Sequence, residues 1–205
     1  MIKRGRASHM KRWLLILLLV VFTWRYFDGP PPVPHGQGVT APESPSQSPV
    51  QGSSFAHKDY RVTPLANFAL TARVLSRRDY RFDREADLSP TDLALGWGPM
   101  SDSAVLNEFS ISQRNRWYFW RADNMVIPRR EVEQHSANMH MIPANSAVER
   151  QLKAIREGDI VTVQGHLVKV EGGDGWRWVS SLSRGDTGDG SCELVWVTSL
   201  SVVSG

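Results

Sequence analysis

The stretch SAVERQLKAIREGDIVTVQGHLVKV, Ser146–Val170, predicts a helix that runs directly into a strand. Ser146 and Glu149 have the spacing of a capping box, in which two side chains satisfy backbone amides at the start of a helix. Apolar residues recur at helical spacing behind this cap, at Val148, Leu152 and Ile155. One face of the helix should therefore be buried, and Gly158 should end it.

Strand patterns dominate the chain around this helix. We expect strands over Asp159–Val170, with a bend at Gly165, over Trp176–Leu182 and over Cys192–Leu200. Upstream, Phe68–Ser76 alternates in character as a strand does.

Two further short helices are predicted before Ser146. Ser89-Pro90 combines a cap residue with a proline in the first turn, so a helix should run from there to Gly96 or Gly98. A second helix is expected over Asp102–Phe109. Short strands with few helices predict an α+β, β-dominated fold: a small, strongly coiled antiparallel sheet or an OB- or SH3-like barrel with two or three short helices.

An apolar run, WLLILLLVVFTWRYF at Trp13–Phe27, precedes this domain. Its core is shorter than the roughly 20 residues that usually span a bilayer, so it could be a cleaved signal or an uncleaved anchor. No small-residue cleavage site follows it. Arg25 and the flanking aromatic residues could lengthen the span by lying at the headgroup level. We therefore predict a transmembrane signal anchor over residues 13–27.

Charge around the run predicts its orientation. Five Lys or Arg residues precede the run and only Arg25 closely follows it, so the positive-inside rule places the N-terminus in the cytoplasm. Residues 1–12 would be a basic cytoplasmic arm. In a Gram-negative cell, the chain would be a single-pass inner-membrane protein with a periplasmic C-terminal domain.

Residues 28–57 are rich in proline, glycine and serine and contain few large apolar residues. Such a composition favours an extended, polyproline-like chain. We therefore predict an unfolded linker over residues 28–57 that holds the domain away from the membrane. A single exported globular domain should comprise residues 58–205.

The predicted domain has almost no net charge. Of the 24 Lys/Arg and 21 Asp/Glu residues in the chain, residues 58–205 hold 18 and 19, a formal charge of −1. Nucleic-acid binding depends largely on neutralisation of phosphates by basic residues, so this balance disfavours a general nucleic-acid-binding function. Cys192 is the single cysteine, which excludes an internal disulfide.

The stretches LALGWGPMSD (Leu93–Asp102), HSANMHMIPA (His135–Ala144) and SSLSRGDTGDGSCELVWV (Ser180–Val197) resemble an uncharacterised family of short, single-pass, membrane-anchored bacterial proteins. The resemblance implies a membrane-anchored protein with one domain. It implies no activity, cofactor or catalytic residue.

Tryptophan is the residue type that points most directly to binding. Trp176 and Trp178 should share one strand face, with Arg177 on the other. Trp117 and Trp120 lie in a strand that is aromatic on both faces, so it lies beneath a helix or presents rings to a partner. Tryptophan and arginine are enriched at binding hot spots, so these five residues are candidates for a binding groove. The alternative is that most of the rings belong to the core.

Histidine and aspartate residues offer an alternative metal or hydrolytic site. His135 and His140 lie close to two methionines, a set that suits copper in an exported protein. On one strand their odd separation would put them on opposite faces, which argues against a preformed site. Asp186 is the third candidate, because Asp186-Thr187-Gly188 matches the triplet of aspartic proteases, although without their apolar flanks.

These features favour a membrane-tethered, non-catalytic binding module that recognises an envelope protein or polymer. A metal-binding or hydrolytic envelope protein that uses His135, His140 and Asp186 is the first alternative. An OB-type nucleic-acid-binding domain is the second. We predict no cofactor, because the sequence has no nucleotide-binding, zinc-binding or haem-attachment motif.

Overall fold

The computed structural model describes residues 11–17, 30–183 and 192–203. The chain divides into two compact units, Met1–Pro31 and Pro32–Gly205. In the first unit, residues 11–17 are helical. No helix in the described part of the chain is both long and apolar enough to cross a membrane. Residues 18–27 of the predicted anchor lie outside the described residues, so the transmembrane helix stays a prediction.

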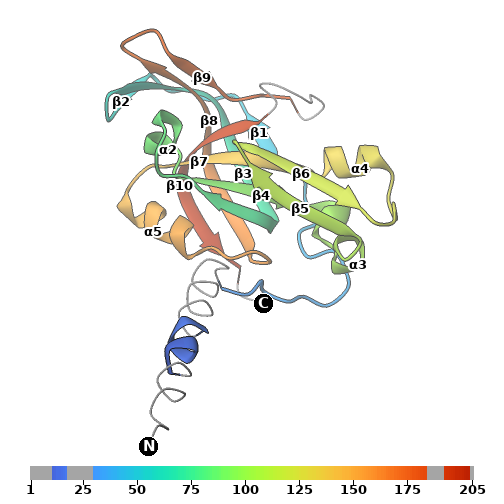
Figure 1. Cartoon of the computed structure of the whole chain (residues 1–205). Coiled ribbons are helices and arrows are strands. Elements are labelled where there is room, and N and C mark those ends of the chain that lie inside the picture. The colour runs from blue at the N-terminus through green and yellow to red at the C-terminus, as the bar shows by residue number, and fades with distance from the viewer. Residues whose placement is uncertain (1–10, 18–29, 184–191, 204–205) are drawn as a thin grey trace, which may run out of the picture. The chain divides into compact units, whose positions relative to one another are not determined.

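The second unit combines many strands with a few short helices, which confirms the predicted α+β, β-dominated class (Figure 1). Its strands are β1 (Ser46–Ser48), β2 (Phe55–His57), β3 (Tyr60–Asp79), β4 (Thr91–Gly96), β5 (Phe109–Arg114), β6 (Trp117–Ala122), β7 (Ser136–Pro143), β8 (Ile160–Gly172), β9 (Arg177–Val179) and β10 (Glu193–Val202). Its helices are α2 (Arg84–Leu88), the 3-10 helix η1 (Gly98–Ser101), α3 (Ser103–Leu106), α4 (Arg129–Gln134) and α5 (Ser146–Ala154).

Five strands pair along a path that returns to its start. β3 pairs with β4, β4 with β7, β7 with β10, β10 with β8, and β8 with β3. This closed ring of five strands, which we also call the barrel, confirms the predicted strongly coiled sheet. The sheet is not wholly antiparallel, however, because β7 and β10 are parallel. The chain between them passes through α5 and β8, which gives the long crossover that a parallel pair requires.

The main hydrophobic core lies inside this ring. Alternate residues of the five strands build it: Phe68, Leu70, Ala72 and Val74 of β3, Leu93 and Leu95 of β4, Met139 and Met141 of β7, Val161, Val163 and Leu167 of β8, and Val195 and Val197 of β10. α5 adds Val148 and Leu152, so the predicted amphipathic helix is confirmed. Its cap is Asn145, whose side chain accepts hydrogen bonds from two backbone amides, and not Ser146 as predicted.

A second hydrophobic cluster lies against the outside of the ring. The start of β3 and the end of β8 continue beyond the ring as a ribbon, to which β2 and β9 are paired. The buried members of this cluster are Tyr60, Val62, Leu88, Ile142, Val168, Val170, Leu194 and Trp196. The cluster therefore joins α2 and the ribbon to the barrel.

The helix predicted from Ser89-Pro90 to Gly96 is wrong. The helix in this region, α2, lies earlier and is capped by Asp83, which accepts a hydrogen bond from Ala86 N at 2.5 Å. β4 occupies the predicted helical segment, because its apolar residues alternate into the core and both of its edges are paired. Burial and pairing outweigh the local cap signal here. The helix predicted over Asp102–Phe109 is present in shorter form as α3.

The predicted unfolded linker is wrong over residues 32–57, which belong to the second unit. Val33 N donates to Glu157 O at 2.7 Å, and Ala41 is fully buried. β1 and β2, which lie in this segment, both pair with β3. A segment without a core of its own is therefore ordered by hydrogen bonds to the barrel. Only residues 28–31 remain between the predicted anchor and the folded unit.

Replacement of Leu152 by alanine should lower the free energy of unfolding by about 2–5 kcal/mol, because this side chain is 1% exposed and fills the core of the ring. Urea denaturation of the full-length protein, followed by tryptophan fluorescence, measures the loss. Gln151→Ala, on the exposed side of α5, is the matched control and should change the midpoint little. Equal midpoints for the native protein and Leu152→Ala would contradict the assigned core.

Candidate binding surface

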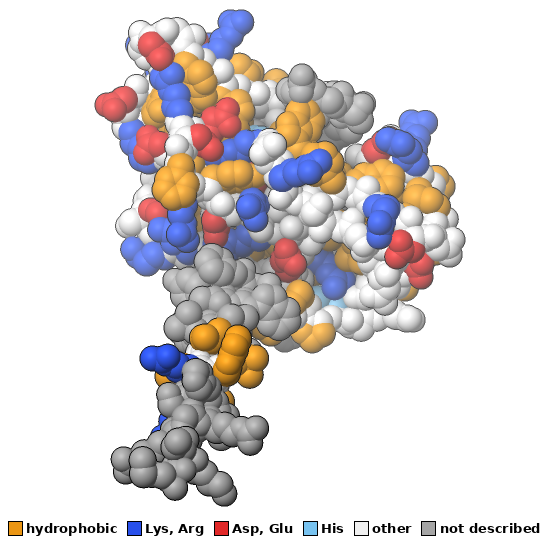
Figure 2. Space-filling model, in the orientation of Figure 1, with side chains coloured by type: hydrophobic (Ala, Val, Ile, Leu, Met, Phe, Trp, Pro, Cys, Tyr) orange, Lys and Arg blue, Asp and Glu red, His pale blue; other side chains and the backbone are white. Residues whose placement is uncertain are grey.

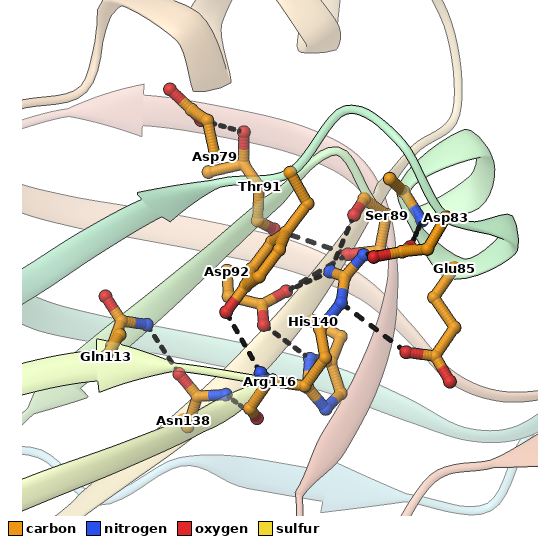
Figure 3. A network of polar contacts seen from close by, with 12 residues as sticks. Asp79, Asp83, Glu85, Ser89, Thr91, Asp92, Gln113, Arg116, Asn138 and His140 are labelled. Atoms are coloured by element: carbon orange, nitrogen blue, oxygen red, sulfur yellow. Dashed lines mark hydrogen bonds and ion pairs between the residues drawn. The ribbon is translucent and has the colours of Figure 1, made fainter.

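A buried ion network lies on the outer face of β4 and β7 (Figure 3). Asp92, which is fully buried, stands opposite His140 in the strand register, and its Oδ2 lies 3.0 Å from His140 Nδ1. The two groups are in contact but are not aligned for a hydrogen bond. Asp92 Oδ1 accepts a hydrogen bond from Arg116 Nη1 at 2.9 Å. Arg116 thus supplies the opposite charge that a buried carboxylate requires.

Arg116 joins three segments of the chain. With Asn115 it forms the two-residue turn between β5 and β6, in which both residues have positive φ, 67° and 52°. This backbone conformation is unfavourable for an arginine. Its guanidinium lies 3.2 Å from Asp83 and 3.5 Å from Glu85, and it donates to Ser89 O at 2.9 Å. These contacts offset the strain and fasten the β5–β6 hairpin and the α2 region to the barrel.

One face of the hairpin is bound to the barrel. Asn138 Nδ2 on β7 donates to Arg116 O at 2.9 Å, and Gln113 Nε2 donates to Asn138 Oδ1 at 2.6 Å. The hydroxyls of Tyr118 and Ser136 share a hydrogen bond of 2.9 Å. Side chains alternate along a strand. The residues of β5 and β6 that precede and follow Gln113 and Tyr118 therefore point away from the barrel.

Besides Ser110 and Ser112, arginine and aromatic side chains make up this second face, which we call the outward hairpin face: Arg114, Trp117, Phe119 and Arg121. Phe119 is 43% exposed, and the Arg114 guanidinium carbon lies 4.9 Å from the centre of its ring. Figure 2 shows basic and hydrophobic side chains interspersed over the region of β5, β6 and α4. The surface therefore combines cation and ring, a pairing suited to recognition.

The four predicted binding tryptophans occupy different environments. Trp117 lies on the outward hairpin face, whereas Trp120 is on the opposite face, where its ring packs with Phe109. Trp176 and Trp178 lie together, with ring centroids 6.3 Å apart, and both pack against the second hydrophobic cluster.

Arg177 is exposed, whereas Trp178 packs against His140, with the centroids of the two rings 4.7 Å apart. Trp176 and Trp178 are both half-buried. Trp178 therefore packs against the ion network, and Trp176 packs against Trp178 and the second hydrophobic cluster.

Arg84 of α2 lies at the edge of these rings. Its guanidinium is 4.6 Å from the ring centre of Trp176 and 5.4 Å from that of Tyr60, and it makes two hydrogen bonds to Asp174, at 2.7 and 2.9 Å. These hydrogen bonds, with a further one from Trp176 N, lower the pKa of Asp174 to about 2. The Gly-rich turn that carries Asp174 is thereby held against α2.

The two histidines of the alternative metal site have different neighbours. His140 contacts Asp92, whereas His135 caps the C-terminal end of α4 and lies 3.2 Å from Glu131 Oε2. Asp186 lies outside the described residues. Within residues 11–17, 30–183 and 192–203, no three His, Cys, Asp or Glu side chains are placed to hold a metal ion.

The loop between β3 and α2 was not among the binding surfaces predicted from the sequence. Its Phe82 is 99% exposed. The neighbouring Arg81 and Asp83 line an open pocket of about 480 Å³, which also reaches the β2–β3 turn and the start of α5. Arginine and aromatic residues that recur through Arg77–Arg84 are the signal that could have identified this loop.

No protein-family model matches this chain, and no curated protein or solved structure shows significant similarity to it. The resemblance to membrane-anchored bacterial proteins therefore stays a prediction.

The Arg84–Asp174 pair should be visible in an NMR titration. We expect the Asp174 carboxyl to have a pKa of about 2, below its ordinary 3.8. Because the folded-state pKa is depressed, the stabilisation from this pair is fully present above the ordinary pKa and is lost as the pH falls through about 2. Arg84→Gln should return the value toward 3.8.

Arg61→Gln is the control, because Arg61 is exposed and forms no ion pair with a described residue. It should leave the Asp174 titration unchanged. A midpoint near 3.8 in the native protein would show that the pair does not form in solution.

Proposed function

We propose that residues 32–205 form an OB-type barrel that acts as a non-catalytic binding module of the cell envelope, tethered to the inner membrane by the apolar run at residues 13–27. Its partner would be an envelope protein or polymer in the periplasm. The observation that carries the proposal is the outward hairpin face, where two aromatic and two arginine side chains point away from the barrel.

The order of the strands supports an OB-type barrel. In chain order, β3, β4, β7, β8 and β10 are the five strands of the ring, in which the third lies beside the fifth and the first beside the fourth. α5 lies between the third and the fourth. An OB barrel has five strands in a Greek-key order and binds ligands on the face of its second and third strands.

The β5–β6 hairpin is inserted between those two strands, β4 and β7, and covers part of their outer face. Arg116 and Gln113 of the hairpin contact Asp92 and Asn138 there. A ligand therefore cannot lie directly on this part of the barrel. The outward hairpin face replaces the covered face of β4 and β7 as the accessible surface. Its side chains are suited to binding and not to catalysis.

The composition of the outward hairpin face suits a macromolecular partner. Burial of the exposed Phe119 ring in an interface would add hydrophobic stabilisation, and the arginine beside it adds a cation–π contact. Such residues are typical anchors of interfaces. A nucleic-acid partner is the alternative for a surface of rings and arginines, but the near-zero net charge of the domain disfavours it.

The segment between the predicted anchor and the folded unit is short. Residues 28–31 can extend over only about 14 Å, since a residue spans at most about 3.6 Å. A module anchored in this way would be confined to partners at or near the membrane surface. Confinement raises the effective concentration of such partners, so that weak intrinsic affinity suffices.

A hydrolytic function is a second candidate, because Asp92 contacts Nδ1 of His140 and thereby leaves Nε2 as a potential base. The His140 side chain is only 5% exposed and the ring of Trp178 packs against it. A substrate has little access to this nitrogen, which favours a structural role for the pair.

Substitution of Phe119 tests the proposal. We expect Phe119→Ser/Arg114→Ser to reduce the recovery of crosslinked partners with the tagged full-length protein about tenfold, because it removes an aromatic anchor and its cation. Recovery is measured by quantitative mass spectrometry after crosslinking in cells. Both residues lie outside the core, so the urea midpoint should stay close to that of the native protein.

Ser112→Ala, directly opposite Phe119 on the same face, is the matched control and should retain the partners. Unchanged recovery of the crosslinked partners with the folded double variant would exclude the outward hairpin face as the binding surface. Retention of a labelled oligothymidine by the native protein, with loss in the double variant, would favour the nucleic-acid alternative.

A further inference from the structure

We propose that the loop between β3 and α2 docks an acidic segment of a protein partner, with Phe82 as the apolar anchor and Arg78 and Arg81 as its cationic flanks. This surface is separate from the outward hairpin face. It does not depend on the function proposed for that face.

Phe82 is placed as an anchor. Its side chain is 99% exposed, which leaves the whole ring in water. The two ends of its loop are nevertheless fixed: Tyr80 N donates to Pro90 O at 2.9 Å, and the Asp83 carboxylate caps α2. A ring presented by a fixed loop loses little conformational freedom when a partner buries it.

The charges around Phe82 are unequal. The acidic residues in and next to the loop are already engaged, since Asp79 at the end of β3 pairs with Arg77, and Asp83 pairs with Arg116. Like Arg77 and Arg116, Arg84 has an acidic partner, which is Asp174. Arg78 and Arg81 are exposed and form no ion pair with any residue that the structure describes. The charges in and next to the loop that have no described ion-pair partner are therefore positive.

The carboxylates that line the pocket beside the loop are also paired. Each of its carboxylates has a cationic partner: Asp83 pairs with Arg116 at 3.2 Å, Asp87 with Lys58 at 2.9 Å and Glu149 with Lys153 at 2.5 Å. Burial lowers the pKa of His57, which favours its neutral form. Arg81 is thus the charge lining the pocket that has no described partner.

The shape of the surface favours a protein segment. The pocket has a volume of about 480 Å³ and apolar walls from Tyr80, Leu88, Pro90 and Pro143. A side chain of a partner can enter such a recess while a neighbouring carboxylate meets Arg81, whose planar guanidinium binds carboxylates in a bidentate manner. A membrane surface would contact Phe82 but would leave this pocket unfilled.

Site-specific photocrosslinking in cells tests the proposal. The full-length protein carries p-benzoylphenylalanine at position 82, with either the native arginines or Arg78→Glu/Arg81→Glu. We expect a protein adduct that maps by mass spectrometry to a segment with an excess of Asp and Glu. Its yield should fall about tenfold in the charge-reversed protein, because like charges then face each other.

Arg61→Glu/Arg130→Glu reverses two other exposed arginines that form no ion pair with described residues, and it should retain the adduct. A urea midpoint for each variant establishes that it is folded. An adduct that persists at full yield in Arg78→Glu/Arg81→Glu, a crosslink only to lipid, an adduct with a segment that is not acidic, or no adduct at all would overturn the proposal. Loss of partners in Phe119→Ser/Arg114→Ser without loss of this adduct would separate the two surfaces.

Discussion

A buried carboxylate, Asp92, is the constraint on which the arrangement of this domain depends. It has no exposed surface, and it projects from a strand whose opposite face builds the core, so the strand cannot turn it toward water. An unpaired charge in such a position would cost several kcal/mol. Arg116 at the hairpin tip pairs with it, and His140 of β7 contacts it. The need to satisfy one carboxylate thus fixes the hairpin, and through Arg116 also the α2 region, on the barrel.

The same constraint decides which surfaces are left for binding. The hairpin that supplies Arg116 also covers part of the β4–β7 face, and Trp178 closes over His140. Side chains on the β4–β7 face that could have formed an open binding site therefore contact the hairpin and Trp178 instead. Rings and arginines remain accessible on the outward hairpin face and around Phe82. Each of these surfaces is held in place by contacts of Arg116 and its acidic partners.

Predictions from sequence were correct where one local pattern decided the structure. The period of Val148 and Leu152 identified α5, because a helix with one buried face needs no distant partner to be recognised. β4 was mistaken for a helix, since its strand character comes from pairing on both edges. A lone aspartate in the apolar stretch TDLALG, Thr91–Gly96, was a signal of a buried charge, but its partner Arg116 is distant in the chain and could not be identified. The segment 32–57 was misassigned for a similar reason, because its order comes from hydrogen bonds to the barrel.

Hydrogen–deuterium exchange of Arg116→Met tests most directly whether Asp92 and Arg116 hold the hairpin. Methionine keeps an unbranched side chain but removes the charge and the donors. In the full-length protein, we expect amides of β5, β6 and α2 to exchange much faster in the variant, while those of β3 and β8 inside the ring stay protected. Unchanged protection of the hairpin, or an equal loss of protection throughout the domain, would contradict a role for Arg116 as the link between the hairpin and the barrel.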